Sequence, residues 1–312
     1  MFSSFIDDLD ARWKQFATTI AGGNGKGNRI DQLNEPGGIS IDHQTQMIYI
    51  ADCTNHRIIE RNLNANTGRI AAGGNGKGKR LDQLSEPIDV VVDRQNNDLI
   101  ISDYGNRRVM RWSLNSNSPS QIIIDDIDCN RLAMHKDGTL YVSDWEKHEV
   151  RRLKKGETHG TVVVGGHGQG NQLNQLNNPS FLFIDNDHTL YISDLKNHRV
   201  VKWMRDAEEG IVVAGGNGQG DRLTQLSRPS GVIVDQSGQV YVADRDNHRV
   251  MRWYEGENEG GIVVGGNGKG QEKNQLNTPT SLSFNEKGDL HVADTANHRI
   301  EKFERDWIAE ER

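Results

Sequence analysis

The chain has 312 residues, of which 34% are apolar and 26% are charged, and its formal net charge is −7. This length suffices for one large domain or two ordinary ones with a sizeable core, so neither a disulfide nor a metal is needed for folding alone. No run of about 18 apolar residues occurs, which excludes a membrane-spanning helix. The negative net charge does not favour binding to a nucleic-acid backbone. Glycine is enriched, at 34 residues, but lacks the period of collagen.

The first 16 residues carry a helical apolar pattern. Six large apolar residues follow one another at steps of 3, 1, 3, 4 and 3 positions: Phe2, Phe5, Ile6, Leu9, Trp13 and Phe16. This spacing places them on one face of a helix, with Asp7 and Asp8 in its first turns. We expect an amphipathic helix over residues 1–16 that packs on the rest of the protein. Contact with a partner is the alternative, because the acidic polar face disfavours an anionic membrane.

The N-terminus and the cysteines bear on the location of the protein. The first residues are acidic and lack the basic start of a secretory signal. Cys53 and Cys129 are the only cysteines, which argues against a disulfide-rich secreted scaffold and favours free thiols. We therefore expect an intracellular, cytoplasmic protein.

Most of the chain is an internal repeat. The motif Asp-x-x-Asn-His-Arg, or a degenerate copy, begins at residues 52, 103, 144, 194, 244 and 294, at intervals of 51, 41, 50, 50 and 50. Four short β-branched or aromatic blocks accompany each copy. Around the fifth copy they cover residues 231–234, 240–243, 249–253 and 261–264. Four short antiparallel strands that recur about every 50 residues predict the blades of a β-propeller.

The two ends of the repeat predict a closed ring. Outer-strand segments occur six times, at residues 18–21, 69–72, 121–124, 161–164, 211–214 and 262–264, and the first precedes any complete blade. The last blade ends after its third strand, at residues 300–303. We therefore expect an all-β, six-bladed β-propeller of four-stranded antiparallel blades over residues 17–304. In it the N-terminal strand completes the last blade and removes the open strand edges, and residues 305–312 form a tail.

The repeat resembles the NHL family. The blocks 229–235 and 240–250, with Trp253 after them, are similar to NHL repeats, which are named for an Asn-His-Leu-type signature. The resemblance covers about residues 17–304 and implies a β-propeller, commonly of six blades. Family members serve as RNA- or protein-binding domains, as extracellular sensor domains and as the lyase domain that completes peptide amidation. Related six-bladed folds include metal-dependent lactonases and strictosidine-synthase-like enzymes, so the fold does not choose the function.

The residues that recur in every blade predict architecture. We expect the Asp, His and Arg of the motif to tie strands and neighbouring blades by hydrogen bonds and ion pairs, and not to bind a metal. The histidines concerned are His56, His148, His198, His248 and His298. The block Gly-Gly-x-Gly-x-Gly, first found at residues 22–27, has five copies that account for 20 of the 34 glycines. We expect these copies to form the loops that cross from the rim back to the axis, with glycine adopting positive φ angles.

The third blade departs from the pattern. Residues 125–130 replace the whole glycine loop and its proline, which accounts for the interval of 41 residues. Near this gap the aligned positions carry an acid, a base and two aromatic residues. We expect a ligand-binding mouth on the face that holds the crossing loops, lined by Asp89, Tyr104, Arg131, Trp145 and, from the fifth blade, Arg245. A plain Asp89–Arg131 salt bridge that fills the space of the lost loop is the alternative.

The sequence carries no signature of an enzyme, since His-x-His, Cys-x-x-Cys and Gly-x-Ser-x-Gly are all absent. His135 and His291 stand out from the repeat but belong to different blades, so we predict no metal ligands. The crossing loops hold nine positive and six negative residues, which is only mildly basic. We expect a monomeric, non-enzymatic scaffold without cofactors that binds a protein, peptide or small molecule. The alternatives are a metal-dependent lyase or lactonase-like enzyme with its site in the central channel, and an RNA-binding domain.

Overall fold

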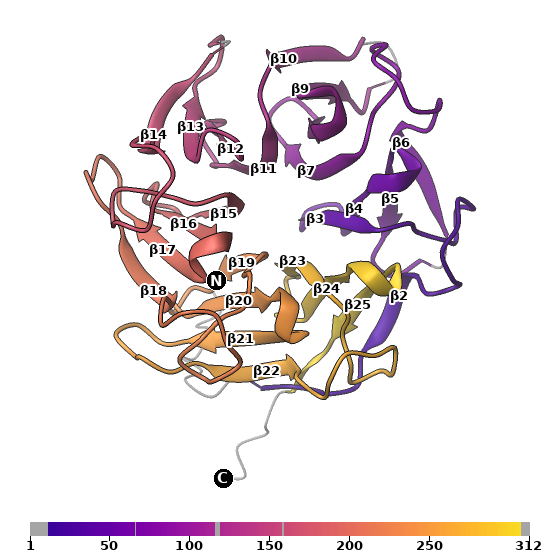
Figure 1. The fold of residues 1–312 in the computed structure, drawn as a ribbon. Coiled ribbons are helices and arrows are strands. Elements are labelled where there is room, and N and C mark those ends of the chain that lie inside the picture. Colours follow the sequence, from indigo (N-terminus) through magenta and orange to yellow (C-terminus); the bar gives the residue numbers. More distant parts are fainter. Residues whose placement is uncertain (1–11, 66, 116–118, 158, 307–312) are drawn as a thin grey trace, which may run out of the picture.

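Six blades surround a central axis in the computed structural model, which describes residues 12–65, 67–115, 119–157 and 159–306 (Figure 1). Each blade is a four-stranded antiparallel sheet whose strands follow one another from the axis to the rim. The predicted six-bladed, all-β fold is therefore confirmed. The helices in the described residues are five 3-10 turns, so none has the length that a bilayer crossing requires.

The first three blades follow the predicted order. Blade 1 contains β3 (Pro36–Asp42), β4 (Met47–Asp52), β5 (Arg57–Asn62) and β6 (Gly68–Gly73). Blade 2 contains β7 (Pro87–Asp93), β8 (Asp98–Asp103), β9 (Arg108–Ser113) and β10 (Gln121–Asp125). Blade 3 contains β11 (Cys129–Met134), β12 (Leu140–Asp144), β13 (Glu149–Leu153) and β14 (Thr161–Gly165).

The last three blades repeat this order, and the sixth takes its outer strand from the other end of the chain. Blade 4 contains β15 (Pro179–Ile184), β16 (Leu190–Asp194), β17 (Arg199–Trp203) and β18 (Ile211–Gly215). Blade 5 contains β19 (Val232–Val234), β20 (Val240–Asp244), β21 (Arg249–Trp253) and β22 (Gly261–Gly265). Blade 6 contains β23 (Pro279–Phe284), β24 (Leu290–Asp294), β25 (Arg299–Phe303) and β2 (Thr18–Gly22).

The ring closes through β2. This strand pairs antiparallel with β25, with Thr18 opposite Lys302 and Gly22 opposite Arg299. Figure 1 shows the indigo β2 beside the yellow β25, so the two ends of the sequence share one blade. The predicted closure by the N-terminal strand is confirmed.

The segment before β2 is not the predicted helix, as far as the structure describes it. Arg12–Trp13 form the short strand β1, which pairs with β26 (Arg305–Asp306) outside the blades. Trp13 is 5% exposed, whereas Phe16 is 69% exposed, so the two rings do not share one buried helix face. The helix prediction is wrong for residues 12–16 because pairing with the chain end overrides the local apolar spacing. Its remaining part, residues 1–11, lies outside the described residues.

The hydrophobic core lies between neighbouring blades. In one buried cluster, for example, Val250 and Val264 of blade 5 pack with Leu282 and Val292 of blade 6. Each sheet therefore buries both faces, while long polar loops cover the two sides of the ring. This arrangement accounts for a modest apolar fraction in a chain of this size.

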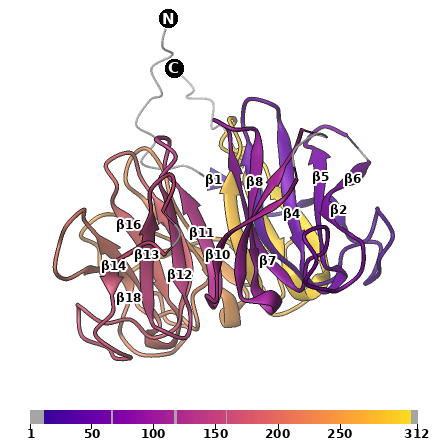
Figure 2. The ribbon, with the colours of Figure 1, turned by 90° about the horizontal axis from the view of Figure 1, so that it is seen from above.

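The strand directions give the ring two different faces. We call the side that holds the crossing loops 22–36, 73–87, 165–179, 215–229 and 265–279, together with the 3-10 turns, the loop face. The hairpins between the first and second strands of each blade lie on the opposite side, the hairpin face. Figure 2 shows the ring from its edge, with β1 at the hairpin side. Gly22, Gly23 and Gly25 have φ angles of 68°, 78° and 78°, as predicted for a tight crossing loop.

Candidate functional site

The repeated Asp, Asn and Arg form a buried frame under each crossing loop. In blade 1, Asp52 accepts hydrogen bonds from the backbone N–H of Asn34 at 2.7 Å, from Asn55 Nδ2 at 2.8 Å and from Arg57 Nε at 2.7 Å. Arg57 also donates to three carbonyl oxygens of the loop, those of residues 28, 29 and 32. The expected structural role of these motif residues is confirmed.

The repeated histidines link each blade to the next. His56 Nδ1 accepts a hydrogen bond from the backbone N–H of Glu86 at 3.1 Å. Four further pairs repeat this contact: His148 with Asn178, His198 with Arg228, His248 with Thr278 and His298 with Glu35. An accepting Nδ1 requires an imidazole without a proton on that atom. We call these five contacts the histidine clasps.

The junction between blades 2 and 3 has neither crossing loop nor clasp. Arg107 stands in the clasp position and pairs with Asp126 at 2.9 Å and with Asp128. In blade 3, Glu149 replaces the frame arginine and pairs with Arg151 at 2.7 Å. The exchange has a physical reason, because the loop carbonyl oxygens that the arginine would bind are missing here.

Asp89 and Arg131 form an ion pair at the axis. Asp89 Oδ1 lies 3.6 Å from Arg131 Nη1, and the two residues are 4% and 3% exposed. Arg131 also donates to the carbonyl oxygens of Ser180, at 3.2 Å, and Ile88, and its guanidinium lies 5.2 Å from the centre of the Phe181 ring. Burial raises the pKa of Asp89 to about 6, although Arg131 opposes this shift. The structure thus brings two of the predicted site residues together in the interior.

The other three predicted residues lie above this pair at partly exposed positions. Tyr104, Trp145 and Arg245 each directly follow the aspartate that ends the second strand of a blade. In blade 6 the equivalent Thr295 donates to the carbonyl oxygen of Pro36 at 2.7 Å, so this position faces the start of an inner strand. We call the six equivalent residues the axial mouth: Cys53, Tyr104, Trp145, Leu195, Arg245 and Thr295.

Arg245 is the charged member of the axial mouth. Its guanidinium lies 3.8 Å from Asp246, and its Nε is buried with no hydrogen-bond partner among the described residues. Burial lowers the pKa of Arg131, and the positive charge of Arg245 lowers it further. Each of these two guanidinium groups thus has a carboxylate beside it, Asp89 for Arg131 and Asp246 for Arg245.

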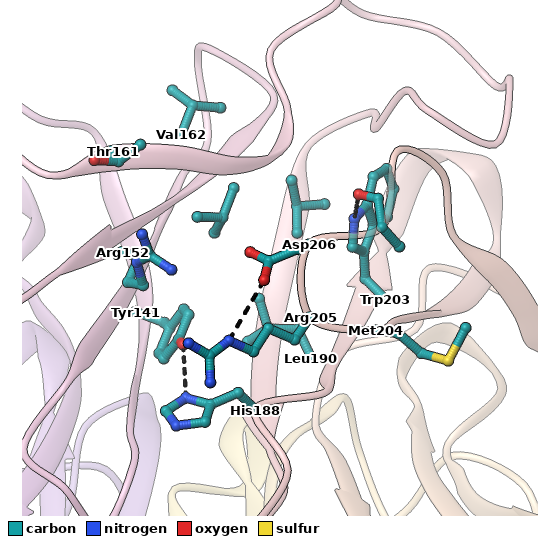
Figure 3. Close-up of a pocket in the computed structure, with 13 residues that line it drawn as sticks. Tyr141, Arg152, Thr161, Val162, His188, Leu190, Trp203, Met204, Arg205 and Asp206 are labelled. Carbon is teal, nitrogen blue, oxygen red and sulfur yellow. Dashed lines mark hydrogen bonds and ion pairs between the residues drawn. The ribbon is translucent and has the colours of Figure 1, made fainter.

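A second site lies between blades 3 and 4, and sequence reasoning missed it. This site is a cavity of about 320 Å³. Its wall includes Tyr141, Arg152, His188, Trp203 and Arg205 (Figure 3). The Tyr141 hydroxyl lies 3.0 Å from His188 Nδ1. One feature of the sequence could have indicated this site. His188 stands at a hairpin position that is glycine in three other blades, at residues 138, 238 and 288.

The residues that could hold a metal lie beside this cavity. His135, Asp137 and His188 each place one possible ligand atom within 4.8 Å of the others. The sequence singled out His135 and His291 as unusual histidines. His291 lies far from this site, buried in β24 of blade 6. The partner of His135 is instead His188, on the neighbouring hairpin.

Comparisons with known proteins support the fold. An NHL repeat model matches residues 226–252, and no curated protein sequence matches the chain. An auxiliary nutrient binding protein from Bacteroides thetaiotaomicron is 15% identical with a TM-score of 0.72, covering 94% of this chain and 76% of that one. A protein of unknown function from the same organism is 16% identical with a TM-score of 0.71, covering 93% and 76%.

An enzyme is also among the similar structures. Virginiamycin B lyase from Staphylococcus aureus is 11% identical with a TM-score of 0.57, and the alignment covers 89% of this chain and 97% of the lyase. At such identities these structures share the fold with this chain, and their activities do not transfer. The chain is therefore a closed ring of six blades in which residues 226–252 match an NHL repeat.

Proposed function

We propose that this propeller is a non-enzymatic binding module whose ligand lies on the axial mouth of the loop face. One observation carries the proposal: the six residues of the axial mouth differ from one another, although the frame beside them repeats in every blade except blade 3. A residue that recurs in every blade maintains the repeat. A position that is free to differ on a rigid frame is available for recognition.

The side chains of the axial mouth indicate the chemistry of the ligand. Tyr104 and Trp145 offer aromatic surface, and Arg245 offers a guanidinium whose Nε has no partner in the described part of the chain. Tryptophan, tyrosine and arginine are enriched among the residues that contribute most to the binding energy of protein interfaces. These three residues suit a ligand with one anionic group and an apolar portion, such as an acidic peptide or a small organic acid. The buried Asp89–Arg131 pair supports the floor of this site.

The channel itself offers little to a metal-dependent enzyme. The aligned residues at the level of the ion pair are Gly38, Asp89, Arg131, Phe181, Gly231 and Ser281, of which Gly231 directly precedes β19 and the others belong to inner strands. Asp89 is the only carboxylate or imidazole among these six residues, and catalytic zinc takes about three protein ligands. This composition favours a binding role over a lyase or lactonase at this level of the channel.

Several cations of the crossing loops are already paired with neighbouring acids. Arg29 pairs with Asp31 at 2.9 Å, and Arg80 pairs with Asp82 at the same distance. Lys77 lies 2.6 Å from Glu86. Cations that are already paired with neighbouring acids contribute less to an electrostatic footprint for phosphates.

The proposal is tested by a thermal-shift screen of short acidic peptides and small aromatic carboxylates, with hits measured by calorimetry. We expect Arg245→Ala and Trp145→Ala to weaken binding of a hit by about tenfold or more. Arg80→Ala is the matched control, because it removes an exposed arginine of the same face away from the axis. Circular dichroism should show the same fold in all three variants.

Binding that survives both axial substitutions would place the ligand elsewhere and refute the proposal. RNA binding with a steep dependence on salt would support the RNA-binding alternative instead. Turnover of a bound carboxylate or peptide would show that the protein is an enzyme.

A further inference from the structure

Two hairpins on the hairpin face bring three possible metal ligands together. His135 and Asp137 belong to the hairpin that follows β11, and His188 belongs to the hairpin that follows β15. His135 Nδ1 lies 2.9 Å from Asp137 Oδ1, and His188 Nε2 lies 3.4 Å from Asp137 Oδ2. The two imidazole rings are 3.7 Å apart between their centres. One carboxylate therefore faces two imidazoles from neighbouring blades.

The outer nitrogen of each imidazole already has a partner. His135 Nε2 lies 3.3 Å from the carbonyl oxygen of Asn186, and His188 Nδ1 lies 3.0 Å from the Tyr141 hydroxyl (Figure 3). Histidines that bind metals are commonly oriented in this way, by a hydrogen bond at the nitrogen that does not bind the ion. Both inner nitrogens are left facing Asp137.

These contacts leave a group of acceptors that face one another. A carbonyl oxygen only accepts, so the proton of a neutral His135 lies on Nε2 and its lone pair lies on Nδ1. Nδ1 accepts a hydrogen bond from the backbone N–H of Asp137 at 3.4 Å, and it also lies 2.9 Å from a carboxylate oxygen, which only accepts. A cation between these atoms, either a metal ion or an extra proton on His135, resolves the conflict.

His188 has a backbone conformation that is unusual for a residue with a side chain. His188 has a φ of 62°, in the left-handed region that glycine adopts without strain. The matching residues of the hairpins in blades 3, 5 and 6 are Gly138, Gly238 and Gly288, all with positive φ. Non-glycine residues held in this region are found preferentially at functional sites. The imidazole therefore occupies a position that is glycine in three other blades, whereas blades 1 and 2 place Gln46 and Asn97 there, also with positive φ.

We propose that His135, Asp137 and His188 bind a divalent transition-metal ion of the zinc class on the hairpin face. Zinc binds nitrogen and oxygen ligands at about 2.0–2.2 Å, so neighbouring ligands of a tetrahedral site stand about 3.3 Å apart. The separations of 2.9 and 3.4 Å from Asp137 to the two imidazoles are close to this value. Two imidazoles with one carboxylate suit zinc better than calcium or magnesium, which take oxygen ligands.

The surroundings set limits on the affinity. The side chain of Asp137 is about half exposed, which leaves room for water at the remaining coordination position. Lys136 donates to Asn186 Oδ1 at 3.1 Å, and Arg152 and Arg205 act on His188 from the cavity side. These positive charges oppose the binding of a metal cation. We therefore expect a dissociation constant of about a micromolar for Zn²⁺, not the much tighter binding of a closed structural site.

The test is calorimetric titration of the chelator-treated protein with ZnCl₂, followed by visible absorption after loading with Co²⁺. We expect one equivalent of Zn²⁺ to bind. His188→Gly and Asp137→Ser should each weaken binding at least tenfold. Both substitutions introduce the residue found at the same hairpin position of blade 5, Gly238 and Ser237, so the metal-free fold should be unchanged. Asp187→Ser is the matched control, because this acid has the position of Asp137 in the next hairpin.

Two outcomes would overturn the proposal. Zinc that still binds to His188→Gly and Asp137→Ser occupies another site. No zinc binding by the unchanged protein, together with a doubly protonated His135 in NMR spectra at neutral pH, would show an ion pair only. Neither outcome affects the ligand site proposed at the axial mouth, which lies on the other face and is tested by other substitutions.

Discussion

Single side chains hold this ring mostly by bonding to backbone atoms of other segments. Arg57 binds three loop carbonyl oxygens, and Arg131 reaches a carbonyl oxygen in the blades on either side of its own. Such contacts replace packing in places where glycine-rich loops have no side chains. One buried residue has no such partner. Glu301 in β25 is fully buried, and neither of its carboxylate oxygens has a well-aligned hydrogen bond in the described structure.

Glu301 should therefore destabilise the protein at neutral pH. Arg299 Nε lies 2.9 Å from Glu301 Oε1, but it donates its hydrogen to Asp294. Burial raises the pKa of Glu301, although Arg299 and a weaker interaction with the Thr19 side chain lower it. We expect Glu301→Met, which introduces the equivalent residue of blade 5, Met251, to raise the free energy of unfolding by about 1–3 kcal/mol at pH 7. Urea denaturation measures this change.

The pH dependence of this gain checks its cause. The pKa of Glu301 is raised on folding, so the folded state keeps its proton as pH rises above the ordinary value of 4.5, and stability is lost over that range. The gain from Glu301→Met should be small near pH 4 and grow as pH rises. Glu301→Gln should show the same trend with a smaller gain. A loss of stability in the methionine variant at pH 7 would mean that the Arg299–Glu301 pair is stabilising.

At the level of elements, the pairing of β1 with β26 joins residues 12–13 to residues 305–306. Trp13 in β1 stacks on Phe284 at 5.9 Å and meets Tyr241 edge-on at 5.5 Å. Its Nε1 donates to the carbonyl oxygen of Gly288 at 2.9 Å. The short pair of strands thus anchors one large aromatic side chain between blades 5 and 6, directly before the strand that closes the ring.

Trp13 should matter to stability far more than Phe16. Truncation of a buried tryptophan typically costs about 3–5 kcal/mol, so Trp13→Ala should lower the urea midpoint strongly. Phe16 is largely exposed, and Phe16→Ala should change the free energy of unfolding by less than about 0.5 kcal/mol. A helix with one buried apolar face would instead make both substitutions costly. Equal effects of the two variants would therefore contradict the strand pairing described for this segment.

The same element shows why some of the structure followed from the sequence and some did not. Repeated strands could be predicted, because each copy of Asp-x-x-Asn-His-Arg confirms the alignment of the others. The segment before β2 occurs only once, so no second copy tests its alignment. Its apolar spacing fits a helix, but in the structure it pairs with the distant residues 305–306. His188 was missed for a related reason. Its contact with Asp137 depends on how two hairpins from neighbouring blades approach each other, and no periodicity records that distance.

For the whole molecule, the histidine clasps connect five of the six blade junctions. The sixth junction, between blades 2 and 3, is tied by Arg107 and its two acids. Burial lowers the pKa of four clasp histidines, His56, His198, His248 and His298, below the ordinary value of 6.5. Protonation of Nδ1 would remove the acceptor of each clasp. Closure of the ring is thus linked to pH at several junctions at once.

The ring should accordingly lose stability as pH falls below 6.5. A histidine whose pKa is lowered on folding binds its proton more readily in the unfolded state, so its contribution is complete above 6.5 and is lost as pH falls through the folded pKa. Urea midpoints measured between about pH 8 and pH 5 should show this decline. His248→Asn removes one titrating clasp and should make the decline shallower. His167→Asn, which introduces the asparagine that the other four glycine loops carry, removes an exposed histidine and should leave the slope unchanged. If both variants kept the slope of the unchanged protein, carboxylates and not the clasps would be responsible for the loss.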